Sequence, residues 1–106
     1  MEINIKDFKK EIKNSKIPVL VEFWGSWCLP CQMMESVLKE LGEKYKGKVK
    51  ILKINSDISP AVSLEYKIMG VPTFILFKEG KELKREVGAK SKEALLKMVD
   101  SFINKN

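Results

Sequence analysis

The chain has 106 residues, of which 44% are hydrophobic, and its formal net charge is +6 at pH 7. This length suits one domain with its own core, and the composition excludes a disordered chain. All 20 basic residues except Arg85 are lysines, and they are spread among glutamates along the chain. Nucleic-acid sites tend to cluster basic residues and add arginine or stacking aromatics, so we interpret the charge as a solvated surface.

The first quarter of the chain predicts a strand, a helix and a second strand. Residues 1–5 alternate in polarity, as a short edge strand does, and Ile5–Asn14 carries apolar side chains at helical spacing. Pro18 breaks that pattern. The run Val19–Trp24 that follows is apolar at both parities, which predicts a central strand covered on both faces.

The only two cysteines of the chain, Cys28 and Cys31, follow this strand with C-x-x-C spacing. If a helix begins there, the two sulfurs lie at i and i+3 on one face, within reach of a disulfide bond. Pro30 suits a first helical turn, where its missing N–H costs no hydrogen bond. The unpaired N–H groups and positive dipole of a helix start favour a thiolate at Cys28. The pair therefore predicts redox chemistry.

Two other interpretations of these cysteines are weaker. A buried structural pair fits poorly with the aromatic and turn residues around it, which include Trp27 immediately before Cys28. A zinc site needs about four ligands. A chain with two cysteines and no histidine could provide such a site only by bridging two copies, so we predict no metal.

The rest of the chain predicts helices and strands that alternate and then form a hairpin. An apolar helical stripe begins at Met34, includes Tyr45 and ends near Gly47. Strands alternating with helices predict right-handed crossovers and helices on both faces of one mixed sheet. The later elements are an inner strand at 49–55, a short helix to about residue 66 opened by Ser59 and Pro60, two strands at 73–77 and 82–87 joined by a tight turn, and a final helix opened by Ser91.

The order and spacing of several short motifs resemble the thioredoxin family over essentially the whole chain. The resemblance implies an α/β thioredoxin fold, with a central mixed five-stranded sheet flanked by about four helices. We expect residues 1–106 to form a single domain of that fold. The motifs are V-E-F-W at 21–24, W-C-L-P-C at 27–31, K-I-N-S-D at 53–57, G-V-P-T at 70–73, the turn at Gly80 and V-G-A at 87–89.

The resemblance implies a role for each of five residues. Cys28 matches the family's exposed nucleophile, and Cys31 matches its buried resolving thiol. Pro72 matches a cis-proline that packs against the disulfide and shapes the substrate groove. Glu22 matches a buried acid that takes the proton of the resolving thiol, and burial favours its protonated form. Lys53 matches a lysine near this acid, with a solvated lysine on the sheet face as the alternative.

The resemblance also implies an apolar surface on which the extended chain of a protein substrate rests. Trp24 matches a tryptophan beside this surface, and we expect it to be structural rather than catalytic. The residues expected to bind the substrate are Trp27, Leu29, Pro30, Val71, Gly88 and Ala89.

Three positions depart from the family pattern. Leu29 replaces the usual glycine between the cysteines, which adds apolar bulk to the docking surface and should shift substrate preference. Glu22 replaces the usual aspartate and is one methylene longer. Ser36 lies where many members carry a proline that kinks the helix, so we expect a straighter helix here.

We expect a cytoplasmic dithiol–disulfide oxidoreductase, because residues 1–17 lack the continuous apolar segment of a secretion signal. The resemblance implies two kinds of partner: disulfide-containing proteins and a thioredoxin reductase linked to NADPH or to ferredoxin. We expect a monomer that uses no organic cofactor, nucleic acid or membrane. Two alternatives stay open, namely an oxidant or isomerase of the same fold and a non-catalytic module that holds a partner on the apolar surface.

Overall fold

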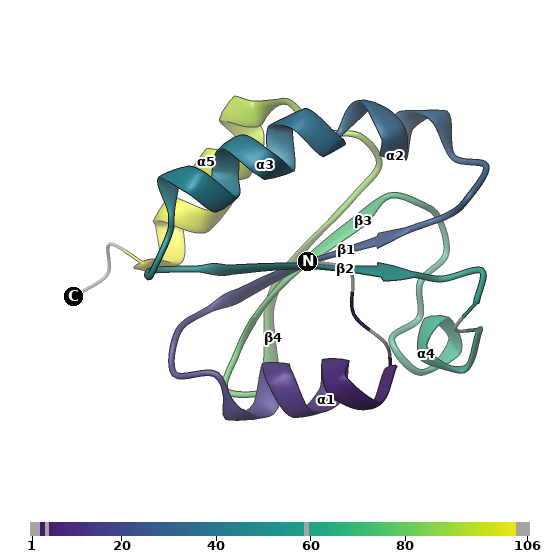
Figure 1. Ribbon diagram of the computed structural model, residues 1–106, viewed down its shortest axis with the longest axis horizontal. Coiled ribbons are helices and arrows are strands. Elements are labelled where there is room, and N and C mark those ends of the chain that lie inside the picture. The colour runs from purple at the N-terminus through teal and green to yellow at the C-terminus, as the bar shows by residue number, and fades with distance from the viewer. Residues whose placement is uncertain (1–2, 4, 59, 104–106) are drawn as a thin grey trace.

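A computed structural model describes residues 3, 5–58 and 60–103 of the chain. These residues form alternating helices and strands, which confirms the predicted α/β class (Figure 1). None of the helices within these ranges is long and apolar enough to cross a membrane. In chain order the elements are α1 (Ile5–Asn14), β1 (Val19–Trp24), α2 (Leu29–Met33), α3 (Glu35–Lys44), β2 (Lys50–Asn55), α4 (Pro60–Glu65), β3 (Thr73–Lys78), β4 (Lys81–Val87) and α5 (Lys92–Ile103).

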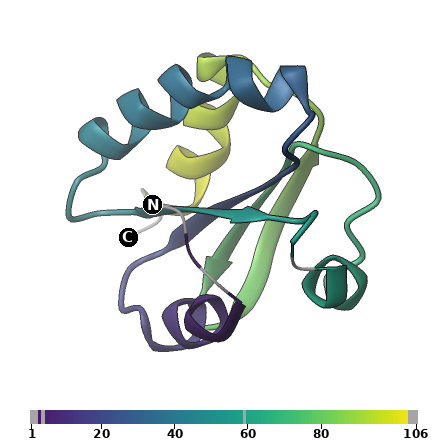
Figure 2. The ribbon, with the colours of Figure 1, turned by 45° about the vertical axis from the view of Figure 1, so that its right-hand side comes forward.

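The described strands form one mixed sheet in the order β2-β1-β3-β4. β1 runs parallel to β2 and antiparallel to β3, and β3 and β4 form the predicted antiparallel hairpin. Trp24 pairs with Asn55, and Phe23 pairs with Thr73, so the ends of β1 and β2 lie beside the start of β3. The loops attached to these three strand ends therefore gather at one end of the sheet (Figure 2).

The fifth strand predicted for residues 1–5 falls largely on residues 1, 2 and 4, which lie outside the described residues. Ile3 is described, and its backbone N–H donates a hydrogen bond to the Lys53 carbonyl oxygen on β2, with an N···O distance of 3.0 Å. The helix predicted from Ile5 begins there. Ser59, predicted to open α4, also lies outside the described residues.

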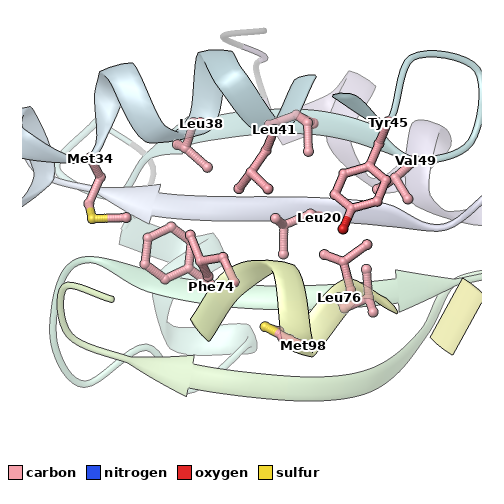
Figure 3. Packing of buried hydrophobic residues seen from close by; sticks show 12 residues of the cluster. Leu20, Met34, Leu38, Leu41, Tyr45, Val49, Phe74, Leu76 and Met98 are labelled. Carbon is pink, nitrogen blue, oxygen red and sulfur yellow. The ribbon is translucent and has the colours of Figure 1, made fainter. Parts of the chain in front are cut away.

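Helices cover both faces of the sheet, and β1 supplies side chains to both cores. α2, α3 and α5 lie on one face, and α1 and α4 lie on the other (Figure 1). Successive side chains of a strand point to opposite faces. Leu20 accordingly joins the core under α3 and α5, while Val21 and Phe23 join the core against α1 and α4. Figure 3 shows the first core, in which Leu38 and Leu41 of α3 lie over β1.

A buried polar contact joins α3 to α5 at the end of this core. Tyr45, directly after α3, is 3% exposed, and its hydroxyl group donates a hydrogen bond to Asp100 of α5 with an O···O distance of 2.6 Å. Burial, together with this hydrogen bond, raises the pKa of Tyr45 well above its usual value. The folded protein therefore stabilises the neutral phenol.

The helix that follows the cysteines is divided, so the expectation of a straighter helix is wrong. α2 ends at Met33 and α3 begins at Glu35, with Met34 between them at φ −84° and ψ −8°. The Met34 N–H points to the carbonyl oxygens of Cys31 and Gln32, which tightens the backbone and interrupts the α-helical ladder. The backbone thus divides the helix without a proline at position 36.

Candidate active site

Cys28 occupies the N-cap position of α2, where the chain arrives from the end of β1. Its Sγ atom accepts a hydrogen bond from the Cys31 N–H at 3.1 Å, in the position that a capping oxygen usually takes. Pro30 lies in the first turn, as predicted. The two cysteines are joined in a disulfide, with their Cα atoms 5.2 Å apart.

The two cysteines differ in their access to solvent. Cys28 is partly exposed, whereas Cys31 is only 3% exposed. Trp27 and Leu29, on either side of Cys28 in the sequence, are 94% and 70% exposed. An incoming disulfide can therefore reach the sulfur of Cys28 more easily than that of Cys31.

Three polar residues brace the loop that carries Cys28. Asp57 accepts a hydrogen bond from the Ser26 backbone N–H at 2.7 Å, and the Asn55 side-chain amide donates to Ser26 Oγ at 3.1 Å. The Asp57 backbone N–H donates in turn to Asn55 Oδ1 at 2.8 Å. The loop is thereby tied to the end of β2, which fixes the chain just before α2 begins.

The Val71–Pro72 peptide bond is cis, as the family resemblance implies. The Pro72 carbonyl oxygen accepts a hydrogen bond from the Gly88 N–H at 2.7 Å, which joins this segment to the chain after β4. Gly88 has φ +91°, a conformation that favours glycine. Val71 lies beside the loop of Cys28, since its Cγ2 atom is 3.5 Å from the place that a Cβ on Gly25 would occupy.

Glu22 is a carboxyl-bearing residue inside β1, with 1% of its surface exposed. Its neighbours in register are Lys53 on β2 and Phe74 on β3. Because Glu22 is two residues from Leu20, its side chain projects to the face covered by α2, α3 and α5 (Figure 1). The acid therefore lies on the same side of the sheet as α2, the helix that contains Cys31.

Lys53 is held by two contacts, so the alternative of a solvated lysine is wrong. Its side chain is 14% exposed, and its Nζ atom lies 3.0 Å from Oε1 of Glu35. The same Nζ atom lies 5.0 Å from the centre of the Trp24 ring, a cation–π distance. The predicted proximity of Lys53 to the acid agrees with its place in the strand register beside Glu22.

A groove of about 840 Å³ lies where α2 meets α3, and Lys53 of β2 contributes to its lining. Within the described residues, no group of three or more His, Cys, Asp or Glu side chains is arranged to hold a metal ion. The groove is lined by Gln32, Met33, Glu35, Ser36, Leu38, Lys39 and Lys53.

The predicted substrate surface consists largely of exposed residues. Trp27, Leu29, Pro30, Val71 and Ala89 are exposed. The two remaining residues are less accessible: Gly88 is partly exposed and Pro72 is buried. Met33, which the sequence suggested to be a packing residue, is exposed, and so are Ile58 and Met69, which the sequence did not single out.

Sequence reasoning missed the partner of Lys53 and the brace of the loop. Glu35 carries no signal that separates it from the other exposed glutamates of a lysine-rich chain. Asn55 and Asp57 could have been found, because they follow a strand that runs parallel to the one leading into Cys28. The carboxyl ends of parallel strands meet at one end of a sheet, where sites commonly form.

Comparison with known proteins extends over nearly the whole chain. A family model described as thioredoxin matches residues 1–101. A thioredoxin from Rickettsia felis is 42% identical over 105 residues, which cover 97% of this chain and 100% of the relative. Thioredoxin 1 from a Nostoc species is 37% identical over 102 residues, or 96% and 95% of the two chains. The chloroplastic M-type thioredoxin of Chlamydomonas reinhardtii is 39% identical over 102 residues, or 96% of this chain and 73% of the relative.

These matches and the geometry of the cysteine pair agree on one class of protein, the protein-disulfide oxidoreductases. The chain belongs to the thioredoxin family. Its activity is thiol–disulfide exchange with protein disulfides through a reversible bond between Cys28 and Cys31. The partners of such a protein are disulfide-containing substrates and a reductase that restores the dithiol.

Proposed function

We propose that the protein is a cytoplasmic disulfide reductase in which Cys28 is the nucleophile and Cys31 is the resolving thiol. The observation that carries this assignment is the contrast at the helix start. Cys28 caps α2 and is partly exposed, whereas Cys31 is 3% exposed. Helix N–H groups favour a thiolate at the cap, and an accessible thiolate can attack a protein disulfide.

The reaction consists of two exchange steps. The Cys28 thiolate attacks one sulfur of the target disulfide, forms a mixed disulfide and releases the other target sulfur as a thiolate. Cys31 then loses its proton and attacks Cys28 Sγ, which releases the second target sulfur and forms the Cys28–Cys31 bond. Two electrons thus pass to the target, and a reductase returns two electrons to the protein.

Glu22 is the proposed acceptor of the Cys31 proton. Three observations support this role: Glu22 is 1% exposed, it projects to the face of the sheet covered by α2, and bulk water has little access to Cys31. A carboxylate so placed can take the proton directly or through one water and later return it. The ammonium group of Lys53, the neighbour of Glu22 in the strand register, favours the carboxylate form of the acid.

The substrate is proposed to lie as an extended chain across the apolar surface next to Pro72. Support comes from the exposure of the predicted residues and from the position of Val71 beside the loop that leads to Cys28. Pro72 has no N–H to offer, so it leaves the neighbouring backbone free to contact the substrate. The proposed surface is formed by Trp27, Leu29, Pro30, Val71, Gly88 and Ala89.

The proposal also covers the partners and the oligomeric state of the protein. Residues 1–106 act as one domain and as a monomer, and a thioredoxin reductase linked to NADPH or to ferredoxin supplies the electrons. The spread of lysines among glutamates over the chain supports a solvated surface without a nucleic-acid site. Neither a metal nor an organic cofactor takes part in the proposed exchange.

The variant Cys31→Ser tests the assignment of the two thiols. It should accumulate a covalent adduct with an oxidised protein substrate through Cys28, because attack survives and resolution does not. Catalytic reduction of insulin by the variant in the presence of dithiothreitol should be lost. In the matched Cys28→Ser variant no such adduct should form. Adducts that peptide mapping places on Cys31 of that variant would reverse the assignment.

A second candidate function is an oxidant or isomerase of the same fold. The observation that favours it is Leu29, which is 70% exposed where the family usually has glycine between the cysteines. The reduction potential decides between the two. A reduction potential of about −270 mV, the reference value for thioredoxin, supports a reductase. A potential between about −180 mV and −120 mV supports an isomerase or an oxidant.

A further inference from the structure

We propose that Glu35 is a positioning residue whose carboxylate holds the Lys53 ammonium group at the groove and thereby sets the pH range in which Glu22 accepts the Cys31 proton. This inference rests on the proposed role of Glu22.

The ion pair between Glu35 and Lys53 connects the start of α3 to the middle of β2. The Glu35 side chain is 71% exposed and the Lys53 side chain is 14% exposed, with 3.0 Å between Oε1 and Nζ. The centre of the Trp24 ring lies 5.0 Å from the same Nζ atom. An anion and an aromatic ring therefore fix the position of a cation on an otherwise flexible stem.

The position of this ammonium group matters because Lys53 is next to Glu22 in the sheet. The two residues are partners in parallel strands, which lie about 4.8 Å apart, and their side chains project to the same face. An ammonium group that moves toward Glu22 favours the carboxylate over the carboxyl form. Glu35, by holding the ammonium group at the groove, limits this effect.

Other charged or titratable groups lie on the same face of the sheet. β3 and α5 contribute apolar neighbours there, Phe74, Leu95 and Met98. Among the described residues of this face and of the helices that cover it, the charged or titratable ones include Cys28 at the N-cap of α2 and Cys31 within it, Lys39 of α3, the Glu40–Lys92 pair between α3 and α5, Lys97 of α5, Glu86 of β4 with its ion-pair partners Lys84 and Lys90, and the Tyr45–Asp100 pair at the far end of α3. Of these elements, β2 supplies the cation that is in register with the acid.

The variant Glu35→Gln keeps the size of the side chain and removes its charge. Lys53 is then free to approach Glu22, and the negative field of Glu35 is also lost, so both changes favour the Glu22 carboxylate. We expect the titration midpoint of Glu22, read from its carbon-13 carboxyl signal in the reduced protein, to fall by about half a pH unit. The pH dependence of single-turnover insulin reduction should move in the same direction.

A matched control lies further along the same helix. Glu40 of α3 also pairs with a lysine, with 3.1 Å between its Oε2 and Nζ of Lys92, and its side chain is 56% exposed. Glu40→Gln makes the same change of charge away from the groove, and it should leave the Glu22 midpoint nearly unchanged. A shift of equal size in Glu35→Gln and Glu40→Gln would overturn the proposal.

A double variant tests whether Glu35 acts through Lys53. Lys53→Met removes the cation, keeps a long side chain and should raise the Glu22 midpoint. In the Lys53→Met background, Glu35→Gln should have a much smaller effect than in the wild type. If the full shift persists in that background, Glu35 acts by its own field and the positioning role is wrong.

The same measurements separate this inference from the proposed role of Glu22. An unmoved midpoint in Glu35→Gln, beside a rate that Glu22→Gln slows, overturns the positioning role alone. If instead Glu22→Gln keeps the rate and pH profile of the wild type, Glu22 is not the proton acceptor. That result overturns the proposed role and the inference with it.

Discussion

The two cores on either side of the sheet differ in chemistry, although β1 supplies side chains to both. The core against α1 and α4 is built around aromatic rings: the Phe8 ring meets those of Phe23, Tyr66 and Phe77 edge to face, with centroids 5.4–5.9 Å apart. The core under α3 and α5 is built mainly from leucine and methionine (Figure 3). That second side of the sheet also carries the ionisable residue Glu22.

This difference teaches how a small domain can place a buried acid on a strand that also completes an apolar core. Val19, Val21 and Phe23 point to the aromatic core, and the alternate positions of β1 point to the side of the redox helix. One strand can therefore carry a buried carboxyl group at Glu22 and still complete an apolar core on its other face. The aromatic core packs against one face of the sheet, and the buried acid and the cysteine pair lie on the other face.

The largest expected effect comes from removing the centre of the aromatic core. Phe8 is fully buried, so Phe8→Ala should lower the free energy of unfolding by about 3–5 kcal/mol through lost burial and a residual cavity. Denaturant unfolding of the oxidised protein, followed by tryptophan fluorescence, measures this change. The folded variant should still reduce insulin, because the aromatic neighbours of Phe8, namely Phe23, Tyr66 and Phe77, are not among the proposed site residues.

Phe8→Leu is the matched control, since it keeps most of the apolar volume and should cost far less stability. The division between the two faces would be contradicted if Phe8→Ala abolished insulin reduction under conditions where the variant remains folded.

The next effect is expected at the buried acid and has the opposite sign. Glu22→Gln should raise the free energy of unfolding at pH 7 by roughly 1–3 kcal/mol, because the folded protein no longer has to bury a charge. Below about pH 4 an unfolded glutamate is itself protonated, so the difference should disappear there. Denaturation midpoints at several pH values measure it.

Turnover should change together with stability in this variant. Glutamine keeps the shape of the side chain but cannot take the Cys31 proton, so insulin reduction should slow. A Glu22→Gln protein that is less stable at pH 7 and fully active would show that the residue is a structural anion.

The smallest expected effect concerns the hydrogen bond between Tyr45 and Asp100. Tyr45→Phe should lower the free energy of unfolding by about 1 kcal/mol at pH 7. Burial raises the pKa of Tyr45 in the folded protein above that of the unfolded chain. The stabilisation is therefore fully present below about pH 10 and is lost as the pH rises further. The wild type should lose stability above pH 10 more steeply than the variant, and parallel curves would disprove this account.

Local patterns in the sequence predicted most of the fold. The run at Val19–Trp24, apolar at both parities, predicted a strand covered on both faces, and β1 is such a strand. Ser91 was predicted to open the last helix, and its Oγ accepts the Ala94 N–H at 3.1 Å. These features follow from residue types within one turn or one strand, so the sequence is sufficient to reveal them.

Features that depend on backbone detail or on tertiary contacts were harder to predict from the sequence. The division at Met34 results from backbone hydrogen bonds that no residue type enforces, and the absence of a proline nearby gave the wrong expectation. Lys53 was correctly linked to Glu22 through the family motif, but its partner Glu35 lies 18 residues away on another element. With many lysines and glutamates available, only the packing of α3 over β2 selects this pair.

The N-cap sulfur of Cys28 links the stability of a helix to the reactivity of a thiol. In the disulfide form this atom accepts the Cys31 N–H of the first turn, and in the dithiol form the same atom would carry the negative charge of the proposed nucleophile. Thermodynamic linkage is reciprocal: whatever free energy the thiolate gives to the first turn of α2, the folded turn gives to the thiolate. A substitution that frays this turn should therefore make Cys28 hold its proton more tightly, even if it touches neither sulfur.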